Sequence, residues 1–162
     1  QIAIVANGSY QSVFRNIVAQ HDFYDRVLVC DFDEGLSRLA FAASDFILMP
    51  SLFEPCGLPQ MTCQYFGSLP VAHDTGGLHD TIEPLDAANH TGNGFLFENY
   101  DDGGLLWAMD EAMRFWQLPS EVKEPEIARV MRESKQRFNH DVTAQEYIKI
   151  YESMLARPLI LH

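Results

Sequence analysis

The chain has 162 residues, of which 47% are hydrophobic and 21% charged, and its formal net charge at pH 7 is −12. This composition is typical of a globular protein, and the length allows one sizeable core, so we predict a single domain over residues 1–162. The negative charge argues against nucleic acid and against an anionic membrane as the main partner. No apolar run approaches the roughly 18 residues of a membrane span.

The cysteines and histidines indicate neither a disulfide framework nor a metal site. Cys30, Cys56 and Cys63 are too few and too irregularly spaced for a set of disulfides, which favours reduced thiols in a cytoplasmic protein. The scattered histidines lack the spacing of metal ligands. We therefore expect no metal and no cofactor.

The first quarter of the chain predicts two strands, each followed by a helix. Residues 1–6 form an apolar run that reads as a buried strand, and with no initiator methionine ahead of it we expect a fragment of a longer protein. Asn7-Gly8-Ser9 predicts a turn and a helix cap. A second strand is expected at 27–30 and a second helix at about 34–43.

The same alternation continues through the middle of the chain. Strands are expected at 46–49, 69–72 and 94–97, with a helix at 60–66. Short strands alternating with helices predict a parallel, right-handed α/β sheet. From Asp101 onward the pattern is helical, and we interpret its aromatic stripes as packing surfaces.

The segment Glu54-Pro55-Cys56-Gly57-Leu58-Pro59-Gln60 follows the third predicted strand and leads into a helix. It places one carboxylate and several backbone N–H groups at the carboxyl end of a strand, where open α/β sheets bind ligands. The N-terminus of a helix attracts phosphate through unpaired N–H groups and the helix dipole. The segment therefore predicts a site for a sugar joined to a nucleotide; the alternative is a strand-to-helix turn with a capping acid.

Residues 50–58 resemble the signature of bacterial glycogen synthases and plant starch synthases, which are retaining glucosyltransferases with a nucleotide-glucose donor. The resemblance continues through residues 65–71, 74–81 and 91–95, and more loosely as far as Tyr151. In that family two Rossmann-like domains face each other across a cleft. The resemblance implies that this chain is most of the second: a Rossmann-like parallel sheet with C-terminal helices, the C-terminal half of a GT-B type glycosyltransferase.

The resemblance also assigns roles within the signature. Glu54 would contact the glucose hydroxyls of the donor and serve as the catalytic carboxylate, close to a ring that acquires oxocarbenium character. The backbone of Cys56, Gly57 and Leu58 would frame the sugar and phosphate. Cys56 is then a contact residue and no nucleophile, although a small buried thiol is an alternative reading.

A second group of candidates, Thr75-Gly76-Gly77, follows the fourth predicted strand, so topology brings it close to the Glu54 turn. Paired glycines permit positive φ angles and close approach of a ligand to the backbone, and a plain loop is the alternative. We expect His73 and Asp74 on a solvated rim; contact with a ligand from the same rim is the alternative. His79 and Asp80 are expected to cap the helix that follows.

Phe32 is the candidate for the nucleotide base. An aromatic residue at its place lies against the adenine in the resembled family, and stacking on a base needs only a π face. The alternative is an ordinary core residue at the end of a strand.

Two residues depart from patterns found in related enzymes. Pro59 stands where the family commonly has Thr or another polar residue, and it removes one possible phosphate donor while suiting a first helical turn. Thr62 stands where many related glycosyltransferases carry a second Glu, which fits the glycogen/starch synthase branch.

The resemblance implies transfer of glucose from ADP-glucose or UDP-glucose to the end of an α-1,4-glucan, with retention and without a metal. ADP-glucose is favoured because the motif looks bacterial. The acceptor side and the Arg/Lys pair that neutralises the pyrophosphate belong to parts of the enzyme outside this chain. We therefore expect the fragment by itself to be inactive and to bind the donor weakly.

Three other functions are alternatives. One is a non-catalytic domain that binds nucleotide-sugar or glucan for regulation or scaffolding. Another is a different glycosyltransferase or epimerase of the same two-domain architecture. A phosphorylase needs a lysine placed for a pyridoxal phosphate Schiff base, and Lys123, Lys135 and Lys149 all lie in the C-terminal helical segment, which argues against it.

Overall fold

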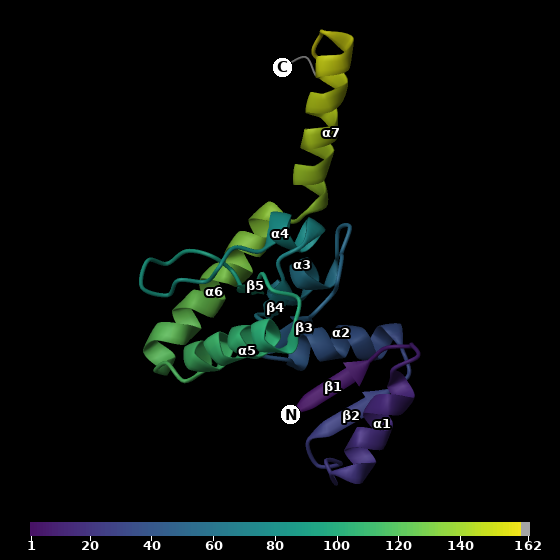
Figure 1. Cartoon of the computed structure of the whole chain (residues 1–162). Helices are drawn as coiled ribbons and strands as arrows, with labels where there is room; N and C mark the ends of the chain where they lie inside the picture. Colours follow the sequence, from purple (N-terminus) through teal and green to yellow (C-terminus); the bar gives the residue numbers. More distant parts are fainter. Residues whose placement is uncertain (160–162) are drawn as a thin grey trace. The chain divides into compact units, whose positions relative to one another are not determined.

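The computed structural model describes residues 1–159, and contacts within the chain divide it into two compact units, residues 1–44 and a second unit that begins at Asp45. Both units consist of parallel strands joined by helices (Figure 1). The predicted parallel α/β fold is confirmed, and each predicted strand is present. The distribution of the five strands over two separate sheets was not predicted.

The first unit has a two-stranded sheet with two helices. Its elements are β1 (Ile2–Val5), α1 (Gln11–Gln20), β2 (Val27–Cys30) and α2 (Glu34–Ala43). β1 pairs with β2 in parallel, with Ile2 opposite Val27. Asp33 caps α2 by accepting the Leu36 N–H at 2.7 Å, as expected of an acidic N-cap residue.

The predicted helix cap at Asn7-Gly8-Ser9 is wrong. The N-cap residue of α1 is Tyr10, and it makes no side-chain cap bond. The Asn7 side chain instead accepts the N–H of Phe32 at 3.0 Å, across the unit. A long-range contact therefore uses the amide that local sequence rules assign to the helix.

The second unit is built on a three-stranded parallel sheet in the order β3-β4-β5. β3 is Phe46–Met49, β4 is Leu69–His73 and β5 is Phe95–Phe97, with α3 (Pro59–Gln64) and α4 (Gly76–Thr81) between the strands. β4 is the central strand and is buried along its whole length. A strand covered on both faces is typical of parallel sheets.

The side chains of the central strand alternate between the two faces of the sheet. Leu69 and Val71 join a core with Phe95, Phe97 and the helix α5 (Asp102–Trp116), whereas Ala72 packs with residues of α4. α5 accordingly lies along one side of the sheet (Figure 1). Both faces are therefore closed, which leaves loops at the ends of the strands.

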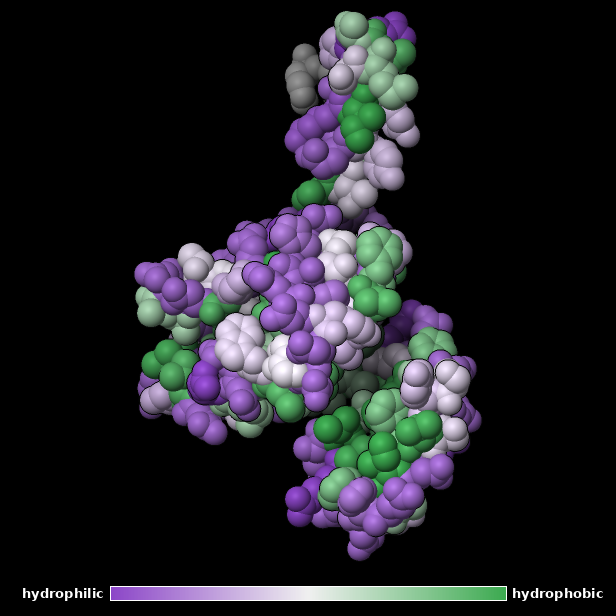
Figure 2. All heavy atoms as spheres, in the orientation of Figure 1, coloured by the Kyte–Doolittle hydropathy of each residue, from purple (hydrophilic) through white to green (hydrophobic). Residues whose placement is uncertain are grey.

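Two further helices complete the chain, α6 (Ser120–Arg137) and α7 (His140–Leu155). α6 contributes Val130 to the core of the sheet. α7 begins at the cap residue Asn139, whose side chain accepts the Val142 N–H, and none of its residues is buried. Figure 2 shows hydrophobic side chains on the surface of α7 and of residues 1–44. No helix within residues 1–159 combines the length and the apolar character that crossing a bilayer requires.

Candidate functional site

Two loops meet where β3 and β4 end. The loop 50–58 follows β3, and residues 74–75 lead from β4 into α4. Adjacent parallel strands end at the same edge of a sheet, and the Gly77 N–H donates to the Glu54 carbonyl oxygen at 2.8 Å. The predicted proximity of Thr75-Gly76-Gly77 to the Glu54 turn is confirmed.

The two glycines are required by this contact. A Cβ atom on Gly76, whose φ is +49°, would lie 2.1 Å from the Glu54 carbonyl oxygen. A Cβ atom on Gly77 would lie 2.1 Å from the Cys56 carbonyl oxygen. The close backbone approach that paired glycines permit is therefore made by the chain itself, through residues 50–58, which we call the signature loop. Any larger residue at Gly77 must push the two loops apart.

Gln60, in the first turn of α3, is hydrogen-bonded to the backbone of the signature loop. Its side chain is fully buried, and its amide nitrogen donates to the carbonyl oxygens of Cys56 and Gly57 and to the Thr81 hydroxyl, at 3.0 to 3.1 Å. One side chain thus joins the turn to the end of α4. Gln60 has no predicted role; a polar residue placed between the apolar residues of a short helix is the signal that points to it.

The Glu54 side chain is half-buried and forms no hydrogen bond or ion pair with another residue in 1–159. The backbone around it is well fixed, because Gly77 holds its carbonyl oxygen and Gln60 holds the two residues that follow Pro55. A free carboxylate on a fixed turn is available to a ligand.

The residues after Glu54 are open to solvent. Cys56 is exposed, so the buried-thiol reading is wrong, and Leu58 is exposed as well. Gly57 adopts a φ of +71°, a conformation that favours glycine. Pro59 is the first residue of α3, where its missing N–H costs no helical bond, so its predicted place is confirmed.

His73 and Asp74 differ from each other in environment. The expectation of a solvated rim is wrong for His73, which is only 8% exposed; its Nδ1 lies 2.8 Å from the Ser51 carbonyl oxygen and its ring lies against Phe97 and Tyr100. His73 therefore positions the start of the signature loop.

Asp74 lies 2.7 Å from the His79 Nδ1, and this hydrogen bond raises the pKa of the His79 imidazole. His79 and Asp80 lie inside α4, which begins at Gly76, so their predicted role as helix caps is wrong. The pair puts an imidazole next to the double-glycine turn, a feature that no local sequence rule signals.

Phe32 lies in the first unit, between β2 and α2, and is 55% exposed. The reading of Phe32 as a core residue is therefore wrong within that unit. Its backbone is held by Asn7, which leaves the ring free for a partner. Within residues 1–159 no group of His, Cys, Asp and Glu side chains is arranged to hold a metal ion.

The sequence pattern of the family "Glycosyl transferases group 1" matches residues 1–128. Among curated proteins, the chain is 44% identical over 125 residues to a glycogen synthase of Xanthomonas campestris pv. campestris, covering 77% of this chain and 24% of that protein. It is 34% identical over 157 residues to a glycogen synthase of Alkaliphilus metalliredigens, covering 95% of this chain and 32% of that protein. The chain thus spans about a quarter to a third of the length of these relatives.

Among solved structures, the fold is similar to the catalytic domain of starch synthase IV from Arabidopsis thaliana bound to ADP and acarbose. The TM-score is 0.75 and the sequence identity 32%, over 90% of this chain and 30% of that one. These matches confirm the resemblance that the signature predicted.

Proposed function

This chain belongs to the glycosyl transferases group 1 family, and we propose that it is the donor-binding part of a glycogen/starch synthase. The whole enzyme would transfer glucose from ADP-glucose, or UDP-glucose, to the end of an α-1,4-glucan with retention at C1. Residues 1–162 would act together as the C-terminal domain of a GT-B enzyme in the cytoplasm. The end of the glucan that accepts glucose would bind to a domain outside this chain.

The observation that carries the proposal is the contact between the Glu54 turn and Gly76-Gly77 at the carboxyl edge of β3 and β4. Residues 54–58 and 75–77 together form what we call the ledge. It has one free carboxylate and lies at the place where α/β sheets bind ligands. The similarity to starch synthase IV, solved with ADP, supports ADP-glucose as the donor.

The chemistry needs two kinds of group. The bond between glucose C1 and the diphosphate oxygen breaks, and C1 bonds to a hydroxyl oxygen of the glucan, whose proton leaves with the nucleoside diphosphate. Glu54 would stabilise the positive charge that develops on the ring and contact the glucose hydroxyls. Backbone N–H groups of Cys56, Gly57, Leu58 and Gly76 would face the sugar and phosphate, where negative charge develops. Thr75 and Gly77, whose N–H groups donate to the His73 and Glu54 carbonyl oxygens, would line the same turn. Phe32 would stack on the base.

The proposal is tested by ligand-observed NMR of the chain with ADP, ADP-glucose, UDP and UDP-glucose. We expect weak, selective binding of the ADP forms, with ADP-glucose bound more tightly than ADP. Glu54→Gln should remove the gain from glucose and leave ADP binding unchanged. The matched control is Glu121→Gln, at an exposed glutamate in the first turn of α6, which should change neither.

Three outcomes decide the details. Tighter binding of the UDP forms would keep the family and reverse the donor. Equal loss in Glu54→Gln and Glu121→Gln would remove Glu54 from the sugar site. Measurable glucose transfer by the 162-residue chain would overturn the prediction that the fragment is inactive.

A further inference from the structure

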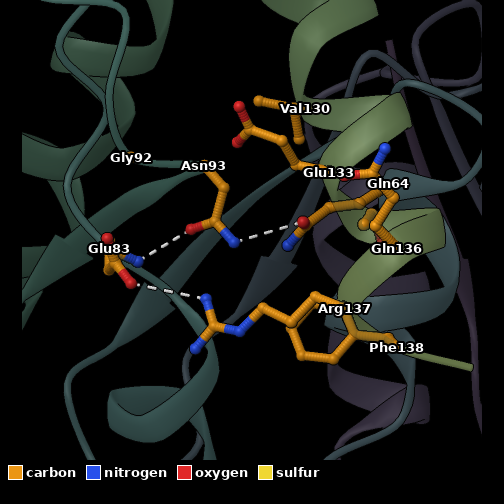
Figure 3. Close-up of a pocket in the computed structure, with 10 residues that line it drawn as sticks. Gln64, Glu83, Gly92, Asn93, Val130, Glu133, Gln136, Arg137 and Phe138 are labelled. Carbon is orange, nitrogen blue, oxygen red and sulfur yellow. Dashed lines mark hydrogen bonds and ion pairs between the residues drawn. The ribbon is translucent and has the colours of Figure 1, made fainter. Parts of the chain in front are cut away.

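The unit that begins at Asp45 has a cavity apart from the signature loop. It has a volume of about 330 Å³ and lies between the C-terminal half of α6, the segment before β5 and the end of α3 (Figure 3). No residue of Glu54–Leu58 or Thr75–Gly77 lines it. The residues that matter are Gln64, Glu83, Asn93, Glu133, Arg137 and Phe138.

The base of the pocket carries a buried hydrogen-bond donor without a partner. Gln64 is 1% exposed, and its Nε2 has no hydrogen-bond partner among residues 1–159. Figure 3 shows its amide group pointing into the pocket beside Asn93. Buried polar groups are nearly always paired, so an unpaired donor that faces a cavity indicates a partner in the cavity, either a ligand or an ordered water.

The orientation of the Gln64 amide follows from its neighbour. The Glu83 backbone N–H donates to Asn93 Oδ1 at 2.7 Å, so Asn93 Nδ2 is the atom that faces Gln64. That nitrogen donates to the Thr81 carbonyl oxygen at 3.0 Å and to Gln64 Oε1 at 3.2 Å. Exchanging the oxygen and nitrogen of Gln64 would place two donors face to face. The free group of Gln64 is therefore the N–H donor.

The charged residues of the lining disfavour an anion. Glu83 pairs with Arg137 at 3.3 Å, and Glu133 pairs with Arg129 at 2.7 Å, so the lining holds two carboxylates and one guanidinium. Arg137, the one guanidinium among the lining residues, is already paired with Glu83, so the lining offers a phosphate no unpaired cation. Each carboxylate can accept further hydrogen bonds from a ligand.

These groups together fit a ligand that both accepts and donates. It would accept from Gln64 and could donate to the oxygen atoms of the exposed carboxylates of Glu83 and Glu133. A neutral sugar meets these needs, because every hydroxyl group is both donor and acceptor. The volume is in the range of small-ligand sites, about 300–1,000 Å³.

We propose that this pocket binds a glucosyl unit of an α-glucan, at a site separate from that of the nucleotide-sugar donor. The class of ligand, a neutral polyhydroxyl compound, follows from the pocket; its identity as an α-glucan rests on the proposed function. A glucan held here would stay attached to the enzyme between successive additions.

The test is a titration of the ¹⁵N-labelled chain with maltotriose. We expect the side-chain amide signals of Gln64 and Asn93 and the backbone signal of Gly92 to shift, with a millimolar dissociation constant. Gln64→Leu, which keeps the volume and removes the donor, should weaken binding at least tenfold. Gln117→Leu, the same substitution at the exposed C-cap residue of α5, should not.

The changes in the NMR signals of the wild-type chain test the proposal even if Gln64→Leu fails to fold. Maltotriose shifts that avoid the pocket, or no shift at millimolar sugar, would overturn the proposal and leave Gln64 bonded to an ordered water only. A separate titration with ADP-glucose, followed at Gly76 and Gly77, reports on the proposed function. Binding of ADP-glucose without maltotriose disproves the pocket alone, and binding of maltotriose without ADP-glucose disproves the donor site alone.

Discussion

The two units of the chain differ in how much of their apolar surface they bury. Within residues 1–44 only Val18 is a buried hydrophobic residue, whereas the unit that begins at Asp45 holds all the other buried apolar residues of the described chain. A two-stranded sheet has no central strand to cover, and such sheets are marginally stable. β4, in contrast, is flanked by a strand on each side and covered on both faces.

This difference parallels the division of the candidate site. Glu54, the Cys56–Leu58 segment and Thr75–Gly77 all lie in the well-packed unit, and Phe32 lies in the other. Contact with a sugar and a phosphate demands accurate geometry, which needs a supported backbone. Stacking on a base demands only an exposed ring. The following experiments test whether the difference in packing is as large as the structure indicates.

The largest difference is expected between two phenylalanines. Phe97→Ala removes a buried ring from the core of the sheet and should lower the free energy of unfolding by about 3–5 kcal/mol. Phe14→Ala, on the exposed face of α1, should lower it by less than about 1 kcal/mol. Urea unfolding followed by far-UV circular dichroism measures this, because both units contain helices, whereas Trp107 and Trp116 lie in α5 and report on the second unit. Equal effects of the two substitutions would refute the comparison.

A methyl group added to the ledge should lower the free energy of unfolding nearly as much. Gly77→Ala places a Cβ atom against the backbone of Cys56 and should destabilise the protein by about 3 kcal/mol, since neither backbone segment can yield easily. Gly8→Ala is the control in the first unit, where the added atom meets nothing within 4 Å, and it should change stability by less than about 0.5 kcal/mol. Thermal unfolding of both variants checks the pair, and a mild Gly77→Ala would mean that the loops are not in contact.

The buried carboxylate of Glu126 predicts a loss of stability in acid. Burial raises the pKa of this carboxyl, but hydrogen bonds from His90 and Arg129 outweigh it and hold the pKa below the usual 4.5. The contribution of Glu126 is therefore complete above pH 4.5 and is lost as the pH falls through the lowered pKa. Glu126→Gln should cost about 1.5–3 kcal/mol at pH 7 and flatten the acid limb of the stability curve.

The exposed pair Arg15–Asp31 is the matched case in the first unit. Its side chains are largely solvated, so Asp31→Asn should change stability less than Glu126→Gln does. Chemical denaturation from pH 7 down to pH 3 measures both variants. An acid limb that is the same in wild type and Glu126→Gln would contradict the assignment.

The smallest perturbation is a thiol-labelling experiment on the folded protein. Burial raises the pKa of the Cys63 thiol to about 12, whereas Cys56 is exposed on the ledge. At pH 8 a disulfide reagent should modify Cys56 at least 100-fold faster than Cys63, because the thiolate is the reactive form. Cys56→Ser identifies the fast site, and urea should make Cys63 reactive. Fast labelling of Cys63 without urea would show that the sheet core opens readily.

Much of the fold could be predicted because the local patterns are strong. Short apolar runs marked each of the five strands, and Asp33 and Asp101 are N-cap residues of the kind that local rules recognise. The signature loop and the double glycine were found as motifs, and parallel topology brought them to one edge of the sheet. These features depend on residues close together in the chain.

The remaining features depend on residues that meet only after folding. The side-chain bonds of Gln60 and the pairing of Asp74 with His79 join residues of different elements. Asn7 illustrates the same point, because a partner at Phe32 replaces its expected local role. Hydrogen-bond partners of polar side chains are set by the geometry of the assembled core, which no periodicity encodes.

The sequence by itself therefore determined the order and type of the elements, the family and the residues of the ledge. Only the tertiary structure decided that the glycines are needed for contact between two loops, that His73 is buried and that Gln64 presents a free donor to a pocket. The physical reason is range: patterns of apolar and turn residues act locally along the chain, whereas burial and pairing arise between segments that the sequence keeps far apart.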